Sequence, residues 1–590
     1  MQTQHFHSLV HTLVHRAQVQ PGRAAYTFLV DGTTAIDSLT YGELDRNSRE
    51  IALMLQRVLK PGDRALLMYP PGLDFISAFF GCLYAGVIAV PAYPPQPSRP
   101  EHSLPRMKAI LTESGSRAVL CKEDFIEKYS SLFHASPELA DCSLLATDHD
   151  GLECIEQWSM PDNTPESLAF LQYTSGSTAA PKGVAVSHAN ILHNLAYIQH
   201  VSFHETQNVL VSWLPTYHDM GLFAGVLFPL FNNCPAYLMS PVSFLQKPVR
   251  WLEAISHFHG TNSGGPNFAY DLCVQRISPE QIRELDLSSW KIAYNGAEPI
   301  RRSTLESFST KFRECGFRRS SLFPVYGLAE STVFVSGKPL SDTQADPITV
   351  ASPSELVNCG SPKFGMDIVI VDPERRTEMQ ADEIGEIWVR GPSVAAGYWN
   401  QPSDTERTFR AFLESGDGPF LRTGDLGFMR TGELHVTGRI KDLIIVRGRK
   451  HYPQDIEQTV ELCHAEVQSQ GTAALSVDFE VGTQLVILVE VSRRLKFRGP
   501  AEDDEVDGVF VGHVEEIVAC IRESVSERHE LQVEAIHLLN RGSIPKTSSG
   551  KIRRHACCDA IKLGNLDCLA SWDLRSGLTQ SRKLMRAALP

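Results

Sequence analysis

Short apolar runs alternate with amphipathic helical segments along the first 360 residues, and this rhythm limits the possible folds more than any other feature. Clear examples of these runs are residues 64–69, 118–121, 209–213 and 290–294. Such an alternation of strand-like and helix-like segments is typical of β–α–β units. We therefore predict an α/β fold with largely parallel sheets.

The sequence pattern changes after about residue 361. Short strands separated by glycine turns follow, for example at residues 367–371 and 385–390. Closely spaced short strands of this kind favour a small, barrel-like β structure. We predict a small β-barrel subdomain over about residues 361–438.

The length of 590 residues is too great for one hydrophobic core, so two or more domains are expected. We predict a large N-terminal domain over residues 1–438, made of two α/β subdomains and the small β subdomain. A charged turn at residues 439–442 marks the boundary. A smaller α+β domain should follow over residues 442–590, with strands such as residues 485–490. Internal repeats are absent from the sequence.

Composition excludes several classes of protein. With 55 Lys and Arg against 69 Asp and Glu, the net charge is −14, so a nucleic acid is not an expected partner. The 13 cysteines are scattered without a C-x-x-C pair, which indicates reduced thiols and no zinc site. The first residues lack a basic start followed by an apolar run, so no secretory signal is expected. Together these features predict a cytoplasmic protein.

Two uncharged stretches, residues 75–92 and 221–245, are long enough to be candidate membrane spans. Glycine and proline interrupt both, and Pro229, Pro235 and Pro241 would leave backbone groups without partners in lipid. We predict that the first stretch is a buried helix followed by a strand. The second should belong to the protein core or to the wall of an apolar cavity, so no membrane span is expected.

A polar loop at residues 171–184 is the strongest functional signal. Its hydroxyls, glycines and lysine follow an apolar strand, so that N–H groups and side chains can turn toward anionic oxygens. The spacing is not that of a Walker A loop. A solvated turn rich in serine and glycine is the alternative. The residues predicted to contact phosphate are Thr174, Ser175, Gly176, Ser177, Thr178 and Lys182.

Motifs further along the chain resemble those of the AMP-forming acyl-adenylating (ANL) superfamily and occur in that superfamily's order. They are Tyr326-Gly327-Leu328-Ala329-Glu330, Arg422-Thr423-Gly424-Asp425, Gly438-Arg439-Ile440-Lys441-Asp442 and a lysine loop at residues 546–554. Segments 212–222, 295–299 and 451–457 look specifically like fatty acyl-AMP ligases. The resemblance covers essentially the whole chain.

The resemblance implies a two-step reaction that consumes ATP. A fatty acid carboxylate attacks the α-phosphorus of ATP to give acyl-adenylate and pyrophosphate, and a thiol then takes the acyl group. Positioned cations suit this accumulation of negative charge better than a protein nucleophile does. By resemblance, Lys551 bridges the carboxylate and the α-phosphate, and Glu330 holds Mg²⁺ because a hard cation prefers carboxylate oxygen. ATP and Mg²⁺ are therefore the expected cofactors.

The resemblance also implies a set of nucleotide-binding residues. In this set Tyr326 stacks on adenine, and Gly296 and Ala297 leave room for the purine. Asp425 accepts the ribose hydroxyls, with Arg439 nearby. An ordinary core aromatic is the alternative for Tyr326. The set is completed by Glu298, Gly327, Leu328 and Ala329.

His218, within a Tyr-His-Asp motif, would lie beside the reacting carboxylate or gate the path of the thiol. A structural histidine is the alternative. The chain departs from the family at Ala179, where glycine is usual, and at Ala329, where threonine is usual. The lost hydroxyl removes one expected donor to the α-phosphate, which leaves Ser331 or a backbone N–H group as replacements.

An acyl pocket is predicted along residues 220–227 and 263–270, where small residues could open a tunnel. Its named wall residues are Met220, Phe223, Gly264, Gly265 and Pro266. Each buried methylene contributes about 0.8 kcal/mol, so eight extra carbons add at most roughly 6 kcal/mol. A medium- or long-chain fatty acid should therefore be adenylated far better than acetate.

The acceptor of the acyl group is less constrained by the sequence. The family segment thought to restrain the small domain would lie between Glu330 and Gly360, and here it is short. No Gly-x-Asp-Ser carrier motif occurs, so any acyl carrier protein must be a separate chain. Lys441 matches the family's hinge, about which the small domain rotates between the half-reactions.

Three functions remain open at this point. The first is a fatty acyl-AMP ligase that serves the holo carrier protein of lipid, polyketide or nonribosomal peptide biosynthesis. The second is an acyl-CoA ligase, which robust formation of acyl-CoA would distinguish. The third is an inactive module that binds a nucleotide or lipid, which release of pyrophosphate from ATP and fatty acid would exclude.

Overall fold

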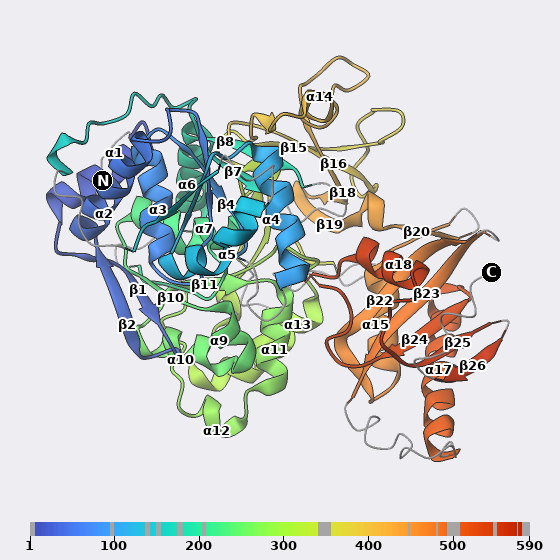
Figure 1. Ribbon diagram of the computed structural model, residues 1–590. Coiled ribbons are helices and arrows are strands. Elements are labelled where there is room, and N and C mark those ends of the chain that lie inside the picture. Colours follow the sequence, from blue (N-terminus) through green and yellow to red (C-terminus); the bar gives the residue numbers. More distant parts are fainter. Residues whose placement is uncertain are drawn as a thin grey trace. The chain divides into compact units, whose positions relative to one another are not determined.

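The computed structural model divides the chain into two compact units. One contains residues 1–423 with 427–436, and the other contains residues 424–426 with 437–590. Figure 1 shows the helices and strands of both units. The structure describes residues 6–94, 100–135, 142–148, 155–173, 181–202, 208–339, 356–446, 449–479, 482–492, 508–546, 551–574 and 576–580.

An eight-stranded sheet organises much of the first unit. In spatial order its strands are β14 (Ser336–Gly337), β13 (Leu322–Tyr326), β12 (Ile292–Asn295), β11 (Asn262–Gly265), β9 (Leu210–Ser212), β10 (Ala236–Met239), β1 (Ala24–Leu29) and β2 (Ala35–Thr40). The pairs from β13 to β1 are parallel, and the two outermost pairs are antiparallel. The carboxyl ends of the central strands therefore meet at one edge, which is where ligands bind in open α/β sheets.

Helices cover both faces of this sheet. One face packs against α10 (Val249–His257), α11 (Asn267–Arg276) and α13 (Arg302–Phe312). These helices contribute Trp251, Tyr270 and Phe308, respectively, to the core on that side. The same side of the unit carries α9 (Pro241–Gln246) and α12 (Pro279–Ile282) (Figure 1). The opposite face packs against α6 (His188–Ser202) and the continuous segment α7 (Asp219–Leu222), η2 (Phe223–Leu227) and α8 (Phe228–Asn232).

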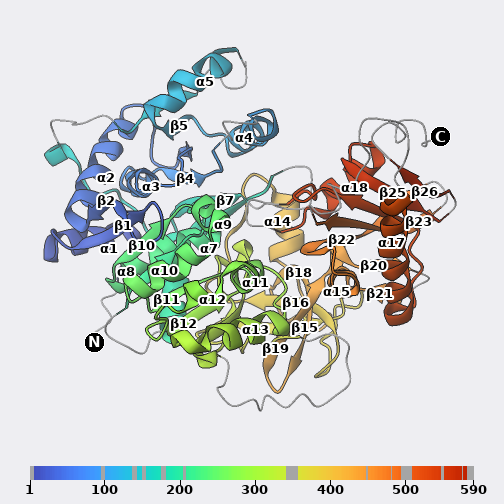
Figure 2. The ribbon, with the colours of Figure 1, turned by 90° about the horizontal axis from the view of Figure 1, so that it is seen from below.

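A seven-stranded sheet forms a second α/β layer system in the same unit. Its strands are β17 (Gly397–Tyr398), β8 (Gly183–Ser187), β7 (Leu168–Tyr173), β4 (Ile88–Pro91), β3 (Arg64–Leu67), β5 (Ala118–Cys121) and β6 (Ser143–Ala146). Figure 2 shows α4 (Pro100–Ser114) and α5 (Glu123–Ala135) beside β5, and Met107 of α4 and Phe125 of α5 join the core on this side of the sheet. The two large sheets confirm the predicted α/β fold.

The helix α3 (Asp74–Tyr84) lies inside the first unit, and all its residues from Phe75 to Tyr84 are buried. It packs closely against α2 (Tyr41–Gln56) and also contacts α1 (Leu9–Val19) and β4. Gly81 is required at the α2 contact, because an added Cβ would lie 2.4 Å from Cγ2 of Ile51. The uncharged stretch 75–92 is therefore a buried helix followed by a strand, as predicted.

A four-stranded sheet occupies the region where the sequence predicts the small β subdomain. Its strands are β15 (Asp367–Val371), β16 (Gly385–Arg390), β18 (Leu421–Arg430) and β19 (Glu433–Arg439), with α14 (Pro402–Phe409) between β16 and β18 in the chain. Trp388 and Phe420 form a small separate core here. The division between the two units runs through β18 and β19.

The second unit is an α+β structure built on a mixed five-stranded sheet. The strands are β22 (Val467–Phe479), β23 (Gly482–Val491), β24 (Ala535–Leu539), β25 (Cys568–Asp573) and β26 (Gly577–Gln580), with a small β20 (Ile444–Val446) and β21 (Arg449–His451) ribbon. Its core includes Ile456 of α15 (Pro453–Cys463) and Ile521 of α17 (Gly508–His529). Cys557 of α18 (Arg554–Lys562) belongs to a separate core that includes other residues of β22, β23 and β24.

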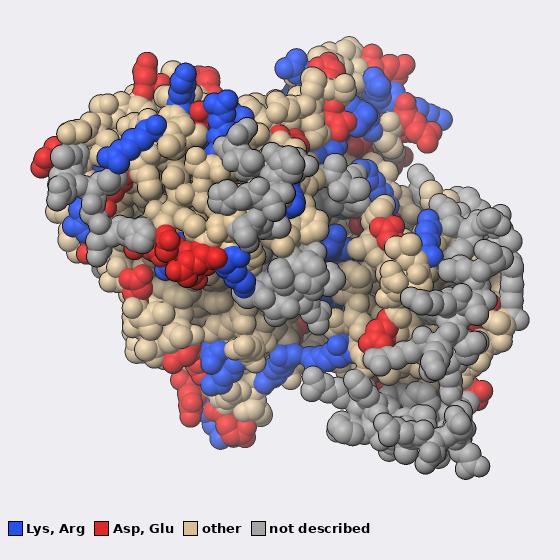
Figure 3. Space-filling view, in the orientation of Figure 1, with Lys and Arg blue, Asp and Glu red and all other residues tan. Residues whose placement is uncertain are grey.

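Charged side chains of both signs are interspersed on the face of the first unit seen in Figure 3, including the region around α12. None of the helices in the described ranges is long and apolar enough to cross a lipid bilayer.

Candidate active site

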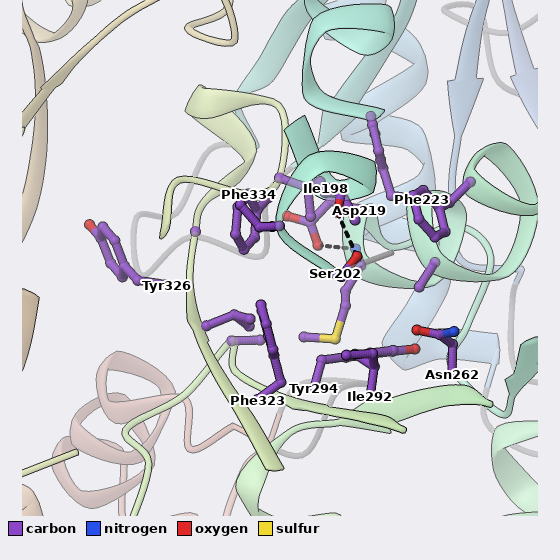
Figure 4. Close-up of a pocket in the computed structure, with 18 of the residues that line it drawn as sticks. Ile198, Ser202, Asp219, Phe223, Asn262, Ile292, Tyr294, Phe323, Tyr326 and Phe334 are labelled. Carbon is purple, nitrogen blue, oxygen red and sulfur yellow. Dashed lines mark hydrogen bonds between the residues drawn. The ribbon is translucent and has the colours of Figure 1, made fainter. Parts of the chain in front are cut away.

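An apolar cavity of about 120 Å³ lies between the eight-stranded sheet and the helices α6 and η2 (Figure 4). The sheet contributes alternate residues of its strands, because successive side chains point to opposite faces. Its lining residues are Ile198, Val201, Ser202, Leu210, Asp219, Met220, Phe223, Ala224, Phe228, Asn262, Ile292, Tyr294, Ala297, Phe323, Val325, Tyr326, Gly327, Val333 and Phe334. The uncharged stretch 221–245 thus supplies part of a cavity wall, as predicted.

The helical wall contains one π-helical turn, η2. Such turns are rare and are frequently found at functional sites, because the extra residue displaces side chains from the regular α-helical positions. Phe223 and Ala224, the first two residues of the turn, both line the cavity. Ala224 is only partly buried, whereas the residues on either side of it are buried. Ala224 is also the smallest of the helical side chains that line the cavity.

The predicted acyl-pocket residues divide into two groups. Met220 and Phe223 line the cavity, whereas Gly264, Gly265 and Pro266 are not among its lining residues. The glycines instead admit neighbouring rings: a Cβ on Gly264 would lie 2.4 Å from Cδ2 of Tyr294, and one on Gly265 would lie 2.7 Å from Cζ2 of Trp213. The sheet side of the wall comes from β9, β11, β12 and β13, and the sequence interpretation missed these contributions to the acyl pocket.

Two motif glycines at the edge of the sheet have a packing role. An added Cβ on Gly327 would lie 1.7 Å from the carbonyl oxygen of Val333, and one on Gly296 would lie 2.5 Å from Cγ2 of Val325. Gly296 therefore leaves room for Val325 on the neighbouring strand, and its predicted contact with a purine stays a prediction. Ala297 beside it adopts a φ of 67°, which is uncommon for a residue with a side chain.

Tyr326 stands at the carboxyl end of β13, at one end of the cavity. Its side chain is directed away from the other labelled lining residues (Figure 4). Leu328 and Ala329 follow it and are buried. Glu298, also predicted to lie near the nucleotide, contacts a helix terminus. Its carboxylate accepts a hydrogen bond of 2.6 Å from the Phe268 N–H group at the start of α11.

Glu330 and Lys182, from different predicted motifs, both contact Tyr398 of β17. The Tyr398 hydroxyl donates to Oε1 of Glu330 at 2.8 Å, and the Lys182 ammonium lies 5.0 Å from the centre of the Tyr398 ring. Lys182 also forms an ion pair with Asp404 of α14. Tyr398 and Asp404 were missed from the sequence, since a lone tyrosine and a helix carboxylate carry no distinguishing pattern.

The turn after Glu330 is strained. Thr332 has φ 68° and ψ −65°, and Val333 N–H donates to the Ser331 carbonyl at 2.8 Å, which defines a γ-turn of the rarer, strained form. The Thr332 hydroxyl donates to the Ser393 carbonyl at 2.6 Å and holds the turn. The Ser331 hydroxyl is fully buried and has no hydrogen-bond partner within the described chain. Strain of this kind costs about 1–3 kcal/mol and collects at functional sites.

His218 forms a close pair with its neighbour, Asp219. Its Nδ1 atom lies 2.7 Å from Oδ1 of Asp219, which also accepts the Met220 N–H group at 2.7 Å. An ionised carboxylate only accepts, so Nδ1 of His218 carries a proton in this pair. Asp219 and Met220 line the cavity, and the His218 side chain keeps 24% of its surface exposed.

The remainder of the predicted phosphate loop, Thr174, Ser175, Gly176, Ser177 and Thr178, lies outside the described residues, as do Ala179 and most of the segment between Glu330 and Gly360. Lys182, at the end of the loop, is partly buried just before β8.

The second unit carries the other predicted residues. Asp425 is 4% exposed and accepts a hydrogen bond of 2.8 Å from Nε of Arg439. Lys441 is exposed in the short helical turn η6 (Ile440–Asp442). Lys551 lies just before a short bridge between Lys546 and Ile552.

A buried ion pair lies close to Lys551 in sequence. Arg554 at the start of α18 contacts the carboxylate of Glu457 in α15 at 2.8 Å, and Glu457 is 3% exposed. Oε1 of Glu457 also accepts the Ala474 N–H group at 3.0 Å. Losing either partner of such a pair would leave a buried charge, which costs about 3–5 kcal/mol. The pair therefore fixes the start of α18 after the lysine loop.

Comparison with known proteins supplies the family. Residues 13–399 match the profile described as AMP-binding enzyme, and residues 441–570 match the AMP domain described as Disco-interacting protein 2-like. The chain is 44% identical to the medium-chain-fatty-acid–[acyl-carrier-protein] ligase JamA of Moorena producens, over 97% of this chain and 98% of that protein. It is 33% identical to the ligase TtuA of Teredinibacter turnerae, of the same description, over 93% and 92% of the two chains.

A solved structure agrees with these sequence matches. The fatty acyl-adenylate ligase of Legionella pneumophila, in complex with acyl adenylate and pyrophosphate, is similar with a TM-score of 0.70 and 40% identity, covering 96% of this chain and 98% of that one. Together with the matched profile and the two α/β sheets, this likeness shows that the chain belongs to the AMP-binding superfamily of acyl-adenylating enzymes, as a member of its fatty acyl-AMP ligase branch.

Proposed function

We propose that this ATP-dependent ligase converts a medium- or long-chain fatty acid to its acyl-adenylate and passes the acyl group to the phosphopantetheine of a separate acyl carrier protein. The observation that carries the proposal is the apolar cavity that ends at Ala297 and Gly327. These residues belong to the motifs that the family uses for the nucleotide. The named activities of JamA and TtuA support the same substrate and acceptor.

In this proposal the acyl chain lies in the cavity and its carboxylate faces the α-phosphate of ATP near Tyr326 and Gly327. The carboxylate oxygen forms a bond to the α-phosphorus, and pyrophosphate leaves. Lys551 stabilises the negative charge that accumulates on both groups, while Asp425 holds the ribose. The apolar wall around Phe223 and Phe334 excludes water, which protects the adenylate from hydrolysis.

Glu330 is the residue that we propose for Mg²⁺. The cation commonly uses one or two carboxylates together with substrate phosphates, so a single carboxylate fits this role. The hydrogen bond from Tyr398 fixes Oε1 of Glu330. When bound, Mg²⁺ would neutralise charge on the phosphates of ATP. Lys182 would add a second positive charge on the other side of Tyr398.

Replacing Tyr398 with phenylalanine should raise the Mg²⁺ concentration needed for half-maximal activity and the KM for ATP by about 10-fold, because a single hydrogen bond to a charged group contributes roughly 1.5 kcal/mol. The KM for the fatty acid should stay within a factor of two. Steady-state pyrophosphate release, titrated in turn with Mg²⁺, ATP and dodecanoate, gives the three constants. An equal rise in all three would indicate a general structural fault instead.

The proposed function is tested with purified protein, ATP and Mg²⁺, followed by mass spectrometry. Dodecanoate should yield acyl-adenylate and pyrophosphate far faster than acetate does. The adenylate should persist when CoA is added and should move to a holo carrier protein. Equal turnover of dodecanoate and acetate would refute the acyl cavity, and prompt formation of acyl-CoA would make this enzyme an acyl-CoA ligase.

The hinge at Lys441 gives a separate test of the two half-reactions. Lys441→Pro should leave adenylation within about twofold and slow transfer to the carrier by 10-fold or more, because proline fixes φ in a turn that must rotate between the steps. Lys441→Ala is the matched control and should retain both steps. Single-turnover assays of adenylate formation and of acyl transfer measure them separately. Equal loss of both steps in the proline variant would point to misfolding.

A further inference from the structure

The cavity has a polar end, opposite the end where the nucleotide motifs lie. Tyr326 is the last residue of β13, and Ala297 follows the end of β12. Asn262 is the first residue of β11 and Ile292 the first of β12, and these two residues are paired in the sheet. The strands β11, β12 and β13 are parallel, so Asn262 and Ile292 lie deepest, at the amino ends of the strands. Figure 4 shows Asn262 and Tyr326 at opposite sides of the cavity.

The depth between these ends suits a medium-length acyl chain. Ala297 lies five residues beyond Ile292, so the two residues are at most about 16 Å apart at about 3.3 Å per strand residue. An acyl chain whose carboxylate lies near Ala297 would therefore bring its last carbons to Ile292 and Asn262.

The Tyr294 hydroxyl occupies this deep end. Its ring lies over Gly264, whose missing side chain provides the space, and its oxygen points toward Asn262 (Figure 4). The Tyr294 backbone carbonyl accepts a hydrogen bond of 2.8 Å from the Tyr270 hydroxyl. Within the described residues the hydroxyl has no hydrogen-bond partner, and burial alone raises its pKa.

Asn262 and Ser202 add two further polar atoms to the cavity lining. The Asn262 amide donates through Nδ2 to Thr261 at 3.1 Å and to Asn208 at 3.4 Å, which leaves Oδ1 without a donor in the described chain. The Ser202 hydroxyl donates to the Ile198 carbonyl at 2.5 Å and keeps a lone pair to accept another bond. The cavity lining thus offers the Tyr294 hydroxyl as a donor and the Asn262 and Ser202 side-chain oxygens as acceptors.

A methyl group at the end of the acyl chain would displace water from the polar groups of Tyr294 and Asn262. It would offer them no hydrogen-bond partner in return. Leaving a buried donor or acceptor unsatisfied is costly, and a site built to bind a hydroxyl discriminates strongly against an analogue that lacks it. We propose that Tyr294, Asn262 and Ser202 recognise a hydroxyl on the distal carbon of the acyl chain, so that the preferred substrates are medium-length ω-hydroxy acids. This inference rests on the proposed function, because it assumes that the cavity holds the acyl group.

The test compares decanoate with 10-hydroxydecanoate in wild-type enzyme and in Tyr294→Phe, with pyrophosphate release as the readout. Wild-type enzyme should favour the hydroxy acid in kcat/KM by about 10-fold or more. The phenylalanine variant should lose that preference, so that kcat/KM for the two acids becomes similar. Tyr237→Phe, which removes the hydroxyl of a tyrosine stacked on Phe258 outside the cavity, is the matched control and should retain the wild-type ratio.

The possible failures can be separated. A wild-type preference for decanoate that Tyr294→Phe leaves unchanged would overturn the inference and leave the proposed function intact. Failure of wild-type enzyme to adenylate either acid would overturn both. Asn262→Ser provides a second variant if Tyr294→Phe does not fold, as judged by its melting temperature. A substrate ratio unchanged in Asn262→Ser would also count against the inference.

Discussion

Replacing Lys551 with alanine should slow formation of dodecanoyl-adenylate by about 100-fold or more, since removing one group that stabilises transition-state charge costs roughly 2.7–4 kcal/mol. The affinity for the fatty acid should change little, because the acyl chain is held by the cavity in the first unit. Rapid-quench measurement of adenylate formation with saturating ATP and dodecanoate separates the chemical step from binding.

The control for this experiment is Lys562→Ala, which removes an exposed lysine from the last turn of α18. It should behave like wild-type enzyme. Transfer of preformed dodecanoyl-adenylate to the carrier should also be less affected in Lys551→Ala than adenylation is, because the charge that Lys551 stabilises develops in the first step. A wild-type rate of adenylation in the alanine variant would reject the assigned role.

A large side chain placed in the acyl cavity should also lower activity about 100-fold, but only for long-chain fatty acids. Ala224→Trp places a large ring in the cavity from the π-helical turn, where the methyl group is the small part of the wall. A chain of twelve carbons would lose contact for about six methylenes at about 0.8 kcal/mol each, an upper bound of roughly 5 kcal/mol. We expect kcat/KM for dodecanoate to fall at least about 100-fold, equivalent to roughly 2.7 kcal/mol.

Butyrate distinguishes a blocked cavity from a damaged enzyme. Its short chain does not reach the ring, so kcat/KM for butyrate should stay within about threefold of the wild-type value in Ala224→Trp. Val242→Trp adds the same ring at a position that is 57% exposed on α9 and should not alter either substrate. If dodecanoate and butyrate lost activity equally, the cavity would not be the acyl site.

The sequence predicted much of the secondary structure correctly because the signals were local. Residues 118–121, 367–371 and 385–390 are strands with the predicted bounds, and residues 209–213 and 290–294 contain strands shifted by one or two residues. The strands at residues 118–121 and 210–212 are buried along their whole length, so a short apolar run was enough to find them. The order of motifs likewise identified the superfamily.

The wall of the cavity could not be predicted in the same way. Gly264 and Gly265 suggested an open tunnel, yet they make room for Tyr294 and Trp213, and a sequence does not reveal which ring fills a missing side chain. Tyr294, Phe323 and Val325 line the cavity because β12 and β13 are neighbours in the sheet. That neighbourhood joins residues about thirty positions apart, beyond the reach of a local pattern.

By itself the sequence determined the alternation of strands and helices, the change to short β strands after residue 361 and the chemistry-bearing motifs, because each depends on residues close together in the chain. Tertiary structure alone decided that Tyr398 joins Glu330 to Lys182 and that Tyr294 directs its hydroxyl toward Asn262. Both arrangements depend on the spatial order of strands and helices, which is set by packing between segments distant in the chain.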